Sequence, residues 1–290
     1  MNVACVVDAK DELGEGPCWS DADRRLYWFD IQGRRLAWFD PESRMHGCWP
    51  LSLRASAAAP LAGGGLIVAT ERGLARTNAQ GGSLELVEPM DLGPGFRSND
   101  GKIDIAGRFW WSRMDDEGGA RPGGVYRTDP GAATVPVLEG IHIPNTLACS
   151  PDGGTFYLAD SKRNTLLAYD LAPDGSLSRG RPFAACEPPV TPDGSAVDAE
   201  GCLWNAQWGG WRIVRYTPDG RVDRVVPMPV EQPTSCAFGG PGLATLYVTS
   251  ARSGLSDEHL ARQPKAGGLF ALDPGVRGLQ LPAFECGRPP

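Results

Sequence analysis

Short runs of apolar, β-branched and aromatic residues recur along the chain at nearly even spacing. The runs begin at Leu26, Leu66, Phe109, Phe156, Leu203 and Leu246. Successive starts lie 40, 43, 47, 47 and 43 residues apart. The runs have the length and composition of strands and lack helical periodicity. Because this period is typical of one four-stranded blade, the sequence predicts an all-β protein, a six-bladed β-propeller with a central channel.

A turn and a second apolar run follow each of these strands, as in RRLAWFD after Gly33 and GLFALD after Gly267. Pro-Asp-Gly turns at Asp174 and Asp219 then lead into further strands, SLSRG and RVDRVV. No shift in composition resembles a linker, so residues 1–290 are interpreted as a single domain. We expect the N-terminal VACVV segment to pair into the last blade, because a propeller must protect its first and last edges.

Two predicted loops are longer than the others. They span residues 115–124 and 252–268, between the second and third strands of blades three and six. Long loops inside a compact repeat often carry function. We therefore expect both at the rim of a functional face.

A polar residue recurs 10 or 11 positions before five of the six central strands. The residues at this offset are Glu15, Asn99, Asn145, Asp193 and Ser235. Equivalent positions of different blades face the common axis, so the first four are expected to converge at one end of the channel. The second blade offers only Ala and Ser there, in RASAAAP.

Carboxylates and carboxamides that converge in a channel are costly to bury unless a cation neutralises them. The sequence therefore predicts one divalent metal ion. Oxygen ligands without a nearby histidine suit Ca²⁺, Mg²⁺ or Mn²⁺, while Fe²⁺ or Zn²⁺ also bind mixed sites, so its identity stays open. Asp193 could instead serve a simple Pro-Asp-Gly turn, as Asp152, Asp174 and Asp219 do, but it occupies the offset shared with Asn145.

The amino-acid composition limits the classes of binding partner that we expect. The net charge of −7, from 28 basic and 35 acidic residues, argues against nucleic acid and anionic membranes. The sequence shows no signal peptide and no apolar run long enough to span a membrane, so we expect a cytoplasmic monomer that acts on a small molecule. Eight cysteines without a Cys-x-x-Cys pair are expected to be reduced and structural.

Other common site chemistries lack support. The three histidines, His46, His142 and His259, are far apart and lack metal-binding spacing. Nucleophile-elbow, phosphate-loop and dinucleotide motifs do not occur.

Five motifs together carry a family resemblance over essentially the whole chain. They are LGEGPCW, RSNDGKID, IPNTLACSPDG, TPDGSAVDAEGCLWNA and PTSCAFGG followed by RQPKAGGLF. With these motifs the sequence resembles the gluconolactonase, regucalcin (SMP-30) and sugar-lactonase family.

The resemblance implies a role for each of several residues. Glu15, Asn145 and Asp193 would ligate the divalent ion, whereas Arg97, Asn99 and the rim residue Glu117 would hold substrate hydroxyls. Ser195 stands where relatives often carry Met, and Thr146 where Gly is common after the ligand Asn. These departures concern the substrate pocket more than the metal.

The implied function is hydrolysis of a sugar aldonolactone to its acid, with a pentonolactone such as D-xylonolactone favoured and gluconolactone possible. Asp193 would be the catalytic residue that orients or deprotonates the attacking water. Two other functions remain open: a non-catalytic, metal-binding regulatory propeller, and a hydrolase of larger esters or organophosphates on the same scaffold. Arg97 and Asn99 favour the lactonase, because a pure ion site needs no hydroxyl-binding groups.

Overall fold

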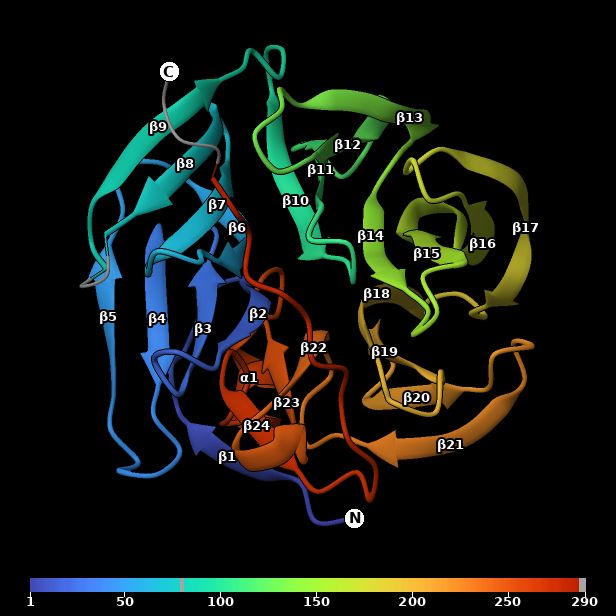
Figure 1. Ribbon diagram of the computed structural model, residues 1–290. Coiled ribbons are helices and arrows are strands. Elements are labelled where there is room, and N and C mark those ends of the chain that lie inside the picture. Colours follow the sequence, from blue (N-terminus) through green and yellow to red (C-terminus); the bar gives the residue numbers. More distant parts are fainter. Residues whose placement is uncertain (79–80, 287–290) are drawn as a thin grey trace.

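Each of the six apolar runs forms the second strand of a four-stranded antiparallel sheet, and the six sheets surround a common axis (Figure 1). The computed structural model describes residues 1–78 and 81–286. Residues 79–80 and 287–290, which the single-domain interpretation included, lie outside the described residues. The predicted six-bladed β-propeller is confirmed.

The strands of the first five blades follow the order of the chain. Blade one contains β2 (Gly14–Ser20), β3 (Arg25–Asp30), β4 (Arg35–Phe39) and β5 (His46–Pro50). Blade two contains β6 (Ala55–Pro60), β7 (Leu66–Thr70), β8 (Gly73–Thr77) and β9 (Leu84–Pro89). Blade three contains β10 (Phe96–Ile103), β11 (Phe109–Asp115), β12 (Gly123–Thr128) and β13 (Val135–Ile141). Blade four contains β14 (Pro144–Cys149), β15 (Thr155–Asp160), β16 (Thr165–Leu171) and β17 (Leu177–Ala185). Blade five contains β18 (Thr191–Val197), β19 (Leu203–Trp208), β20 (Arg212–Tyr216) and β21 (Val222–Pro227).

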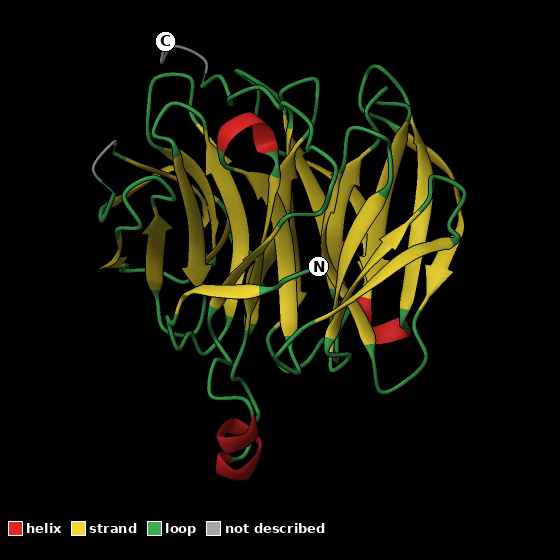
Figure 2. Ribbon diagram, turned by 90° about the horizontal axis from the view of Figure 1, so that it is seen from below, coloured by secondary structure: helices red, strands yellow, loops and turns green. Residues whose placement is uncertain are grey.

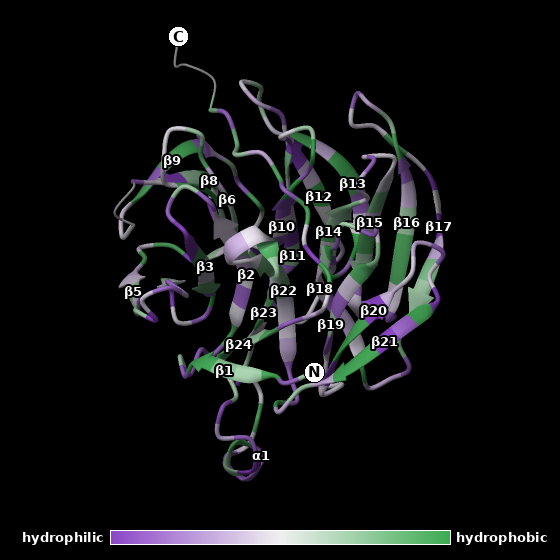
Figure 3. Cartoon of the chain, turned by 60° about the horizontal axis from the view of Figure 1, so that its bottom comes forward, coloured by the Kyte–Doolittle hydropathy of each residue, from purple (hydrophilic) through white to green (hydrophobic). Residues whose placement is uncertain are grey.

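The last blade joins the two ends of the chain. It contains β22 (Pro233–Gly239), β23 (Thr245–Ser250), β24 (Leu269–Leu272) and, as its outer strand, β1 (Ala4–Val7). Ala4 lies opposite Ala271 in the antiparallel pair of β1 and β24. The apolar β1, green in Figure 3, thereby covers an edge that would otherwise expose unpaired backbone groups.

The core lies between the blades. Large side chains of the second strands are fully buried there, among them Trp28, Trp110, Trp111, Phe156 and Trp204. Their burial removes apolar surface from water, which holds neighbouring sheets together. This packing fixes the innermost strands, β2, β6, β10, β14, β18 and β22, around the channel.

The two faces of the ring differ (Figure 2). One face carries the loops between second and third strands. There the loop after β23 contains a short helix, α1 (Asp257–Arg262), which the sequence interpretation did not foresee and which projects from the ring in Figure 3. Ser256 caps α1 by accepting a hydrogen bond from the His259 N–H, and Asp257 and Glu258 occupy the first turn, so the local signal was present.

The C-terminal segment crosses the opposite face, as the red strap in Figure 1. Gly278 N donates to Leu243 O in blade six, and Phe284 N donates to Pro60 O in blade two. Phe284 is buried and packs edge-on against Phe109. The segment therefore covers the channel at that face. Over the described residues, no helix has the length and apolar character needed to cross a membrane.

Candidate metal and substrate site

Every innermost strand has an irregular register at the same level of the channel. The register shifts occur between Glu15 and Cys18, Ala55 and Ala57, Ser98 and Gly101, Asn145 and Ala148, Pro192 and Ser195, and Pro233 and Cys236. A bulge locally turns side chains away from the regular alternation of a strand. The polar residues at the shared sequence offset all fall at these irregularities.

Gly16 shows how tightly the first bulge is packed. Its φ is 56°, in the left-handed region, and an added Cβ would lie 2.1 Å from the Ser56 carbonyl oxygen of the next blade. Only glycine fits this close approach. The glycine after Glu15 thus lets blades one and two meet beside that carboxylate.

Asn99 and Asn145 come together from neighbouring blades. Asn99 Nδ2 donates to Asn145 Oδ1 at 2.8 Å, and Asn145 Nδ2 donates to Ser161 Oγ at 2.9 Å. Ser161 Oγ in turn donates to Pro192 O at 2.6 Å, directly before Asp193. Both asparagines are buried. The network fixes the orientation of the Asn145 carboxamide, with one lone pair of Oδ1 left free for a further partner.

Glu15 and Asp193 are buried carboxylates that repel each other. Their exposed fractions are 7% and 6%. Burial, followed by the charge of Asp100, raises the pKa of Glu15 to about 8. Burial, followed by the charges of Glu15 and Asp100, raises the pKa of Asp193 well above its usual range. Both groups therefore bind protons strongly when no cation is close.

These residues fit a hard divalent cation. Glu15 Oε2 accepts a hydrogen bond from the Gly16 N–H at 2.9 Å, and the Gly194 N–H lowers the pKa of Asp193, but neither carboxylate has an arginine or lysine ion pair among the described contacts. Two carboxylates and one carboxamide oxygen are the donor set that Ca²⁺ or Mn²⁺ prefers. A cation among them would relieve the repulsion.

Arg97 lies beside the asparagines and is held from two sides. Its Nη1 donates to Asn99 Oδ1 at 2.7 Å and its Nε donates to Asp116 Oδ1 at 2.8 Å. Arg54 also donates to Asp116, at 2.6 Å, and pairs with Glu71. Partial burial of Asp116 acts to raise its pKa. The hydrogen bond from Arg54 and the charge of Arg97 outweigh this effect, so the pKa of Asp116 is lowered. Arg97 is therefore oriented before any ligand arrives.

Glu117, the rim residue that the resemblance implied, is exposed in the loop after β11. The contact to Arg97 comes from its neighbour Asp116, which sequence reasoning missed. The consecutive acidic residues Asp115, Asp116 and Glu117 gave no signal to separate them. Asp115 instead pairs with Arg121 of the same loop.

Thr146 adopts a backbone conformation that has a structural cost. Its φ is 80°, a region that disfavours residues with a Cβ. Thr146 Oγ1 donates to Asp193 O at 2.8 Å and contacts Ser195 Oγ at 3.0 Å. Thr146 and Ser195 thus contact each other, and Thr146 supports the backbone at Asp193.

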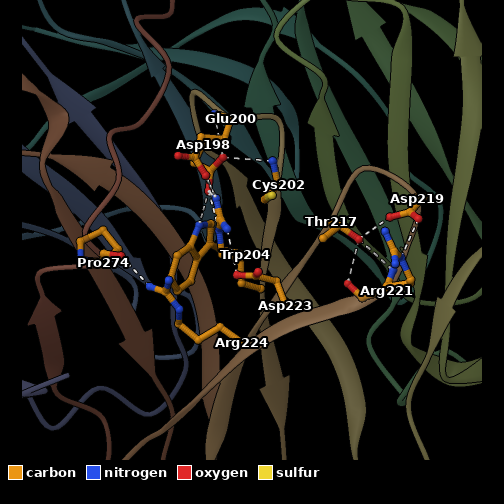
Figure 4. A network of polar contacts seen from close by, with 11 residues as sticks. Asp198, Glu200, Cys202, Trp204, Thr217, Asp219, Arg221, Asp223, Arg224 and Pro274 are labelled. Atoms are coloured by element: carbon orange, nitrogen blue, oxygen red, sulfur yellow. Dashed lines mark hydrogen bonds and ion pairs between the residues drawn. The ribbon is translucent and has the colours of Figure 1, made fainter.

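A second acidic group lies outside the channel. Ligand atoms of Asp198, Glu200 and Cys202 lie within 4.8 Å of one another. Asp198 Oδ2 already accepts from Trp204 Nε1 at 2.8 Å (Figure 4). It also accepts from Arg215 Nε at 2.8 Å, and Arg215 pairs with Glu200 as well. Because the guanidinium of Arg215 neutralises these carboxylates, the group is a structural ion-pair network.

Blade three contains the same device. Asp104 Oδ2 accepts from Trp110 Nε1 at 2.8 Å and from Arg108 Nε at 2.6 Å. The six-residue spacing from Asp to Trp is the same as between Asp198 and Trp204. Repetition in another blade marks the arrangement as part of the blade architecture.

Residues 13–252 match the family model described as "SMP-30/Gluconolactonase/LRE-like region". The chain belongs to this family. It is 37% identical to L-arabinolactonase from Azospirillum brasilense over 96% of this chain and 94% of the relative. It is 36% identical to 6-deoxy-6-sulfogluconolactonase from Pseudomonas putida over 97% of both chains.

A solved structure of a family member has the same fold. The chain aligns with regucalcin from Agrobacterium tumefaciens, described as a calcium-binding protein, with a TM-score of 0.91 and 31% identity. The alignment covers 97% of this chain and 96% of the other. The two chains thus share one fold over nearly their whole length.

Proposed function

We propose that this chain hydrolyses a sugar aldonolactone to the aldonic acid with the help of one divalent cation held by Glu15, Asn145 and Asp193. Membership of the family and the lactonase names of its relatives make it a lactone-hydrolysing enzyme, an ester hydrolase. The metal requirement, the residue roles and the sugar are the proposal. The observation that carries it is the pair of buried, mutually repelling carboxylates beside an oriented asparagine.

The cation would supply Lewis-acid polarisation of the ester carbonyl and stabilise the negative charge that develops on its oxygen. Ca²⁺, Mn²⁺, Fe²⁺ and Zn²⁺ are all candidates, and the calcium-binding description of the Agrobacterium relative supports the first. The oxygen-only donor set supports Ca²⁺ and Mn²⁺ equally.

Asp193 is proposed as the catalytic residue. Its backbone is fixed by Thr146 Oγ1 and by Asn205 Nδ2, which donate to the Asp193 carbonyl oxygen at 2.8 and 2.9 Å. A carboxylate held in this way can accept a proton from an attacking water and later deliver it to the ring oxygen that leaves. Fixed geometry is what makes such a transfer efficient.

Arg97 and Asn99 are proposed to bind the sugar hydroxyls. Arg97 donates from Nε to Asp116 and from Nη1 to Asn99 and to the Ser98 carbonyl oxygen, so among the described contacts only its Nη2 group is left to bind acceptor oxygens of the substrate. Because the guanidinium is already oriented, the binding energy of the sugar is used to place the ester near Asp193. Glu117 remains a prediction as a third hydroxyl-binding residue at the rim.

A pentonolactone is the proposed substrate class, supported by the arabinolactonase relative. D-xylonolactone remains the specific candidate favoured by overall sequence likeness. The sulfogluconolactonase relative shows that the family also accommodates six-carbon acids, so gluconolactone belongs in the same substrate panel.

The sharpest test compares two aspartates in identical Pro-Asp-Gly tripeptides. Asp193→Ala is expected to lose both stoichiometric metal binding and at least about a thousandfold in kcat/KM. Asp219→Ala, at an exposed turn between β20 and β21, is the matched control and should keep both. Metal content after dialysis and acid release from L-arabinolactone, D-xylonolactone and gluconolactone are measured. Full activity in Asp193→Ala would exclude the assignment.

A wild-type protein that binds the metal with no lactone turnover would instead favour the non-catalytic regulatory function. Turnover restricted to aryl esters or organophosphates would favour the third function. The same panel, extended with one phosphotriester and one aryl ester, separates these outcomes.

A further inference from the structure

Lys102 crosses the channel below the candidate metal ligands. It lies on β10 of blade three, and its Nζ donates to Cys236 O, on β22 of blade six, at 3.4 Å. Contacts between successive innermost strands follow the chain order and close between β22 and β2, so blades three and six stand on opposite sides of the ring. The ammonium group of Lys102 has therefore passed the axis of the channel.

This lysine separates two spaces. On one side lie Glu15, Asn145 and Asp193. On the other is a cavity of about 650 Å³, which Lys102 lines together with small and apolar residues of the innermost strands and with Leu279–Ala283 of the C-terminal strap. Lys102 thus forms the floor of the candidate metal site.

Asp100 is a third buried carboxylate at the same level. It is 2% exposed, and its Oδ1 accepts from the Gly101 N–H at 2.8 Å. Its Oδ2 is buried without a hydrogen-bond partner among the described residues. Burial raises the pKa of Asp100, while the charge of Lys102 and hydrogen bonds from the backbone N–H groups of Gly101 and Thr146 act in the opposite direction. Among the described contacts this buried carboxylate has no ion pair, so a nearby cation would stabilise its ionised form.

The fixed charges around the centre can be counted. When they are ionised, as they would be around a bound cation, Glu15, Asp100 and Asp193 bring three negative charges and Lys102 brings one positive charge, while the charge of Arg97 is matched by Asp116. The remainder is two negative charges, which one divalent cation neutralises. A trivalent ion, or a second divalent ion, would leave the buried centre with excess positive charge, which is unfavourable in a low-dielectric environment.

We propose that Asp100 and Lys102 are positioning residues of opposite charge that set how strongly the site binds its cation and which ionic charge it prefers. The inference rests on the proposed metal site and adds two residues that are not ligands. Asp100 strengthens cation binding, and Lys102 weakens it and restricts the site to one divalent ion. Neither residue is required to touch the substrate.

The test measures metal affinity, with Ca²⁺, Mn²⁺ and Tb³⁺ as probes, by titration calorimetry of the chelator-treated full chain. Asp100→Asn keeps the side-chain shape. It is expected to weaken the binding of Mn²⁺ roughly tenfold and the binding of Tb³⁺ by a larger factor. Lys102→Met keeps most of the length of the side chain. It is expected to strengthen the binding of Mn²⁺ roughly tenfold and the binding of Tb³⁺ by a larger factor. The double variant should return close to wild-type affinity for divalent ions. Lys10→Met, at an exposed lysine, is the matched control and should change nothing.

The inference is supported if the two variants change metal affinity in opposite directions and the changes are larger for Tb³⁺ than for Mn²⁺. A loss of structure would instead weaken the binding of all three ions in both variants. Two single variants that both weaken binding, or equal effects on the two ionic charges, would overturn it. Lys102→Gln replaces Lys102→Met if the latter does not fold, with the same expectation. If the wild-type chain binds none of the probes, the proposed metal site itself is wrong, and that outcome is distinct from a failure confined to the variants.

Discussion

Asn99 Nδ2 donates a 2.8 Å hydrogen bond to Asn145 Oδ1, across the boundary between blades three and four. The bond joins the group proposed to bind sugar to a group proposed to bind metal. Asn99 also accepts from Arg97, so one amide side chain links the guanidinium to the candidate ligand. Changes at Asn99 should therefore affect both substrate and metal binding.

Asn99→Ala is expected to weaken metal binding roughly tenfold, because Asn145 loses the donor that orients its Oδ1. kcat/KM should fall by a larger factor, since hydroxyl binding is lost as well. Metal titration and lactonase kinetics are measured on the same preparation. Ser161→Ala, which removes the contact at the other end of Asn145 and the hydrogen bond to Pro192 O before Asp193, provides the comparison and should weaken metal binding without the additional rise in KM. Unchanged metal affinity in Asn99→Ala would show that the contact does not matter.

Asp116 and Glu117 are neighbours, but substitutions at the two positions are expected to have different effects. Asp116→Asn should raise KM roughly tenfold with a smaller change in kcat, because Arg97 and Arg54 both lose a charged partner. Glu117→Gln tests the direct contact with substrate that the family resemblance implies. Steady-state kinetics with a pentonolactone separate the two roles. If only Glu117→Gln raises KM, the orientation of Arg97 by Asp116 is unimportant.

The pH dependence of stability should differ between the metal-free and metal-loaded protein. The pKa of Glu15 is raised to about 8 in the folded chain, so folding favours its protonated form. Stability from this group is present below its ordinary pKa near 4.5 and is lost as pH rises toward 8. Asp193 and Asp100 shift in the same direction. The melting temperature of chelated protein should therefore fall between about pH 5 and pH 8.

Bound cation removes most of this decline, because it stabilises the ionised carboxylates, and metal affinity should rise over the same pH interval. Burial also raises the pKa of Asp11 to about 7, but that residue lies outside the channel and affects both forms alike. Thermal unfolding with and without metal, recorded at the same pH values, isolates the contribution of the site. If the melting temperatures of the metal-free and metal-loaded protein changed with pH in parallel, the proposed metal site would be contradicted.

Arg215 provides a test that the Asp198 group is structural. Arg215→Met leaves the buried Asp198 carboxylate without its counter-charge and is expected to lower the free energy of unfolding by roughly 3 kcal/mol. Metal stoichiometry should stay unchanged in this variant and in Cys202→Ala. Denaturant unfolding and metal content are measured. A loss of one bound metal per chain in Cys202→Ala would place a metal at this network.

The blade pattern could be predicted because each blade repeats the same local contrast between apolar strands and polar turns. The constant offset of Glu15, Asn99, Asn145 and Asp193 from the central strands depends on the same repetition, and the structure places all four at bulges of innermost strands. The pairing of the N-terminal segment into the last blade was expected from the need to protect edges, but other features that do not repeat were missed. The strap that ends at Phe284 depends on long-range contacts with Pro60 and Phe109, which no local pattern encodes.

The charged residues that surround the candidate ligands could not be predicted from the sequence either. Asp100 and Lys102 stand in the motif RSNDGKID, but their alternation along a strand does not reveal that the lysine reaches the opposite blade. Asp116 could not be chosen over Glu117, because a loop conformation decides which carboxylate faces Arg97. The α1 helix is different, since Ser256 and the acidic residues after it form a recognisable helix start.

Metal-restored lactone hydrolysis tests the central claim most directly. Chelator-treated protein is assayed for acid release from a panel of pentono- and hexonolactones, with single divalent ions added back and spontaneous hydrolysis subtracted. We expect a rate near background without metal and recovery with at least one ion on one or two of the sugars. Full activity in the chelated, metal-free protein, or no activity with any ion despite measured binding, would contradict it.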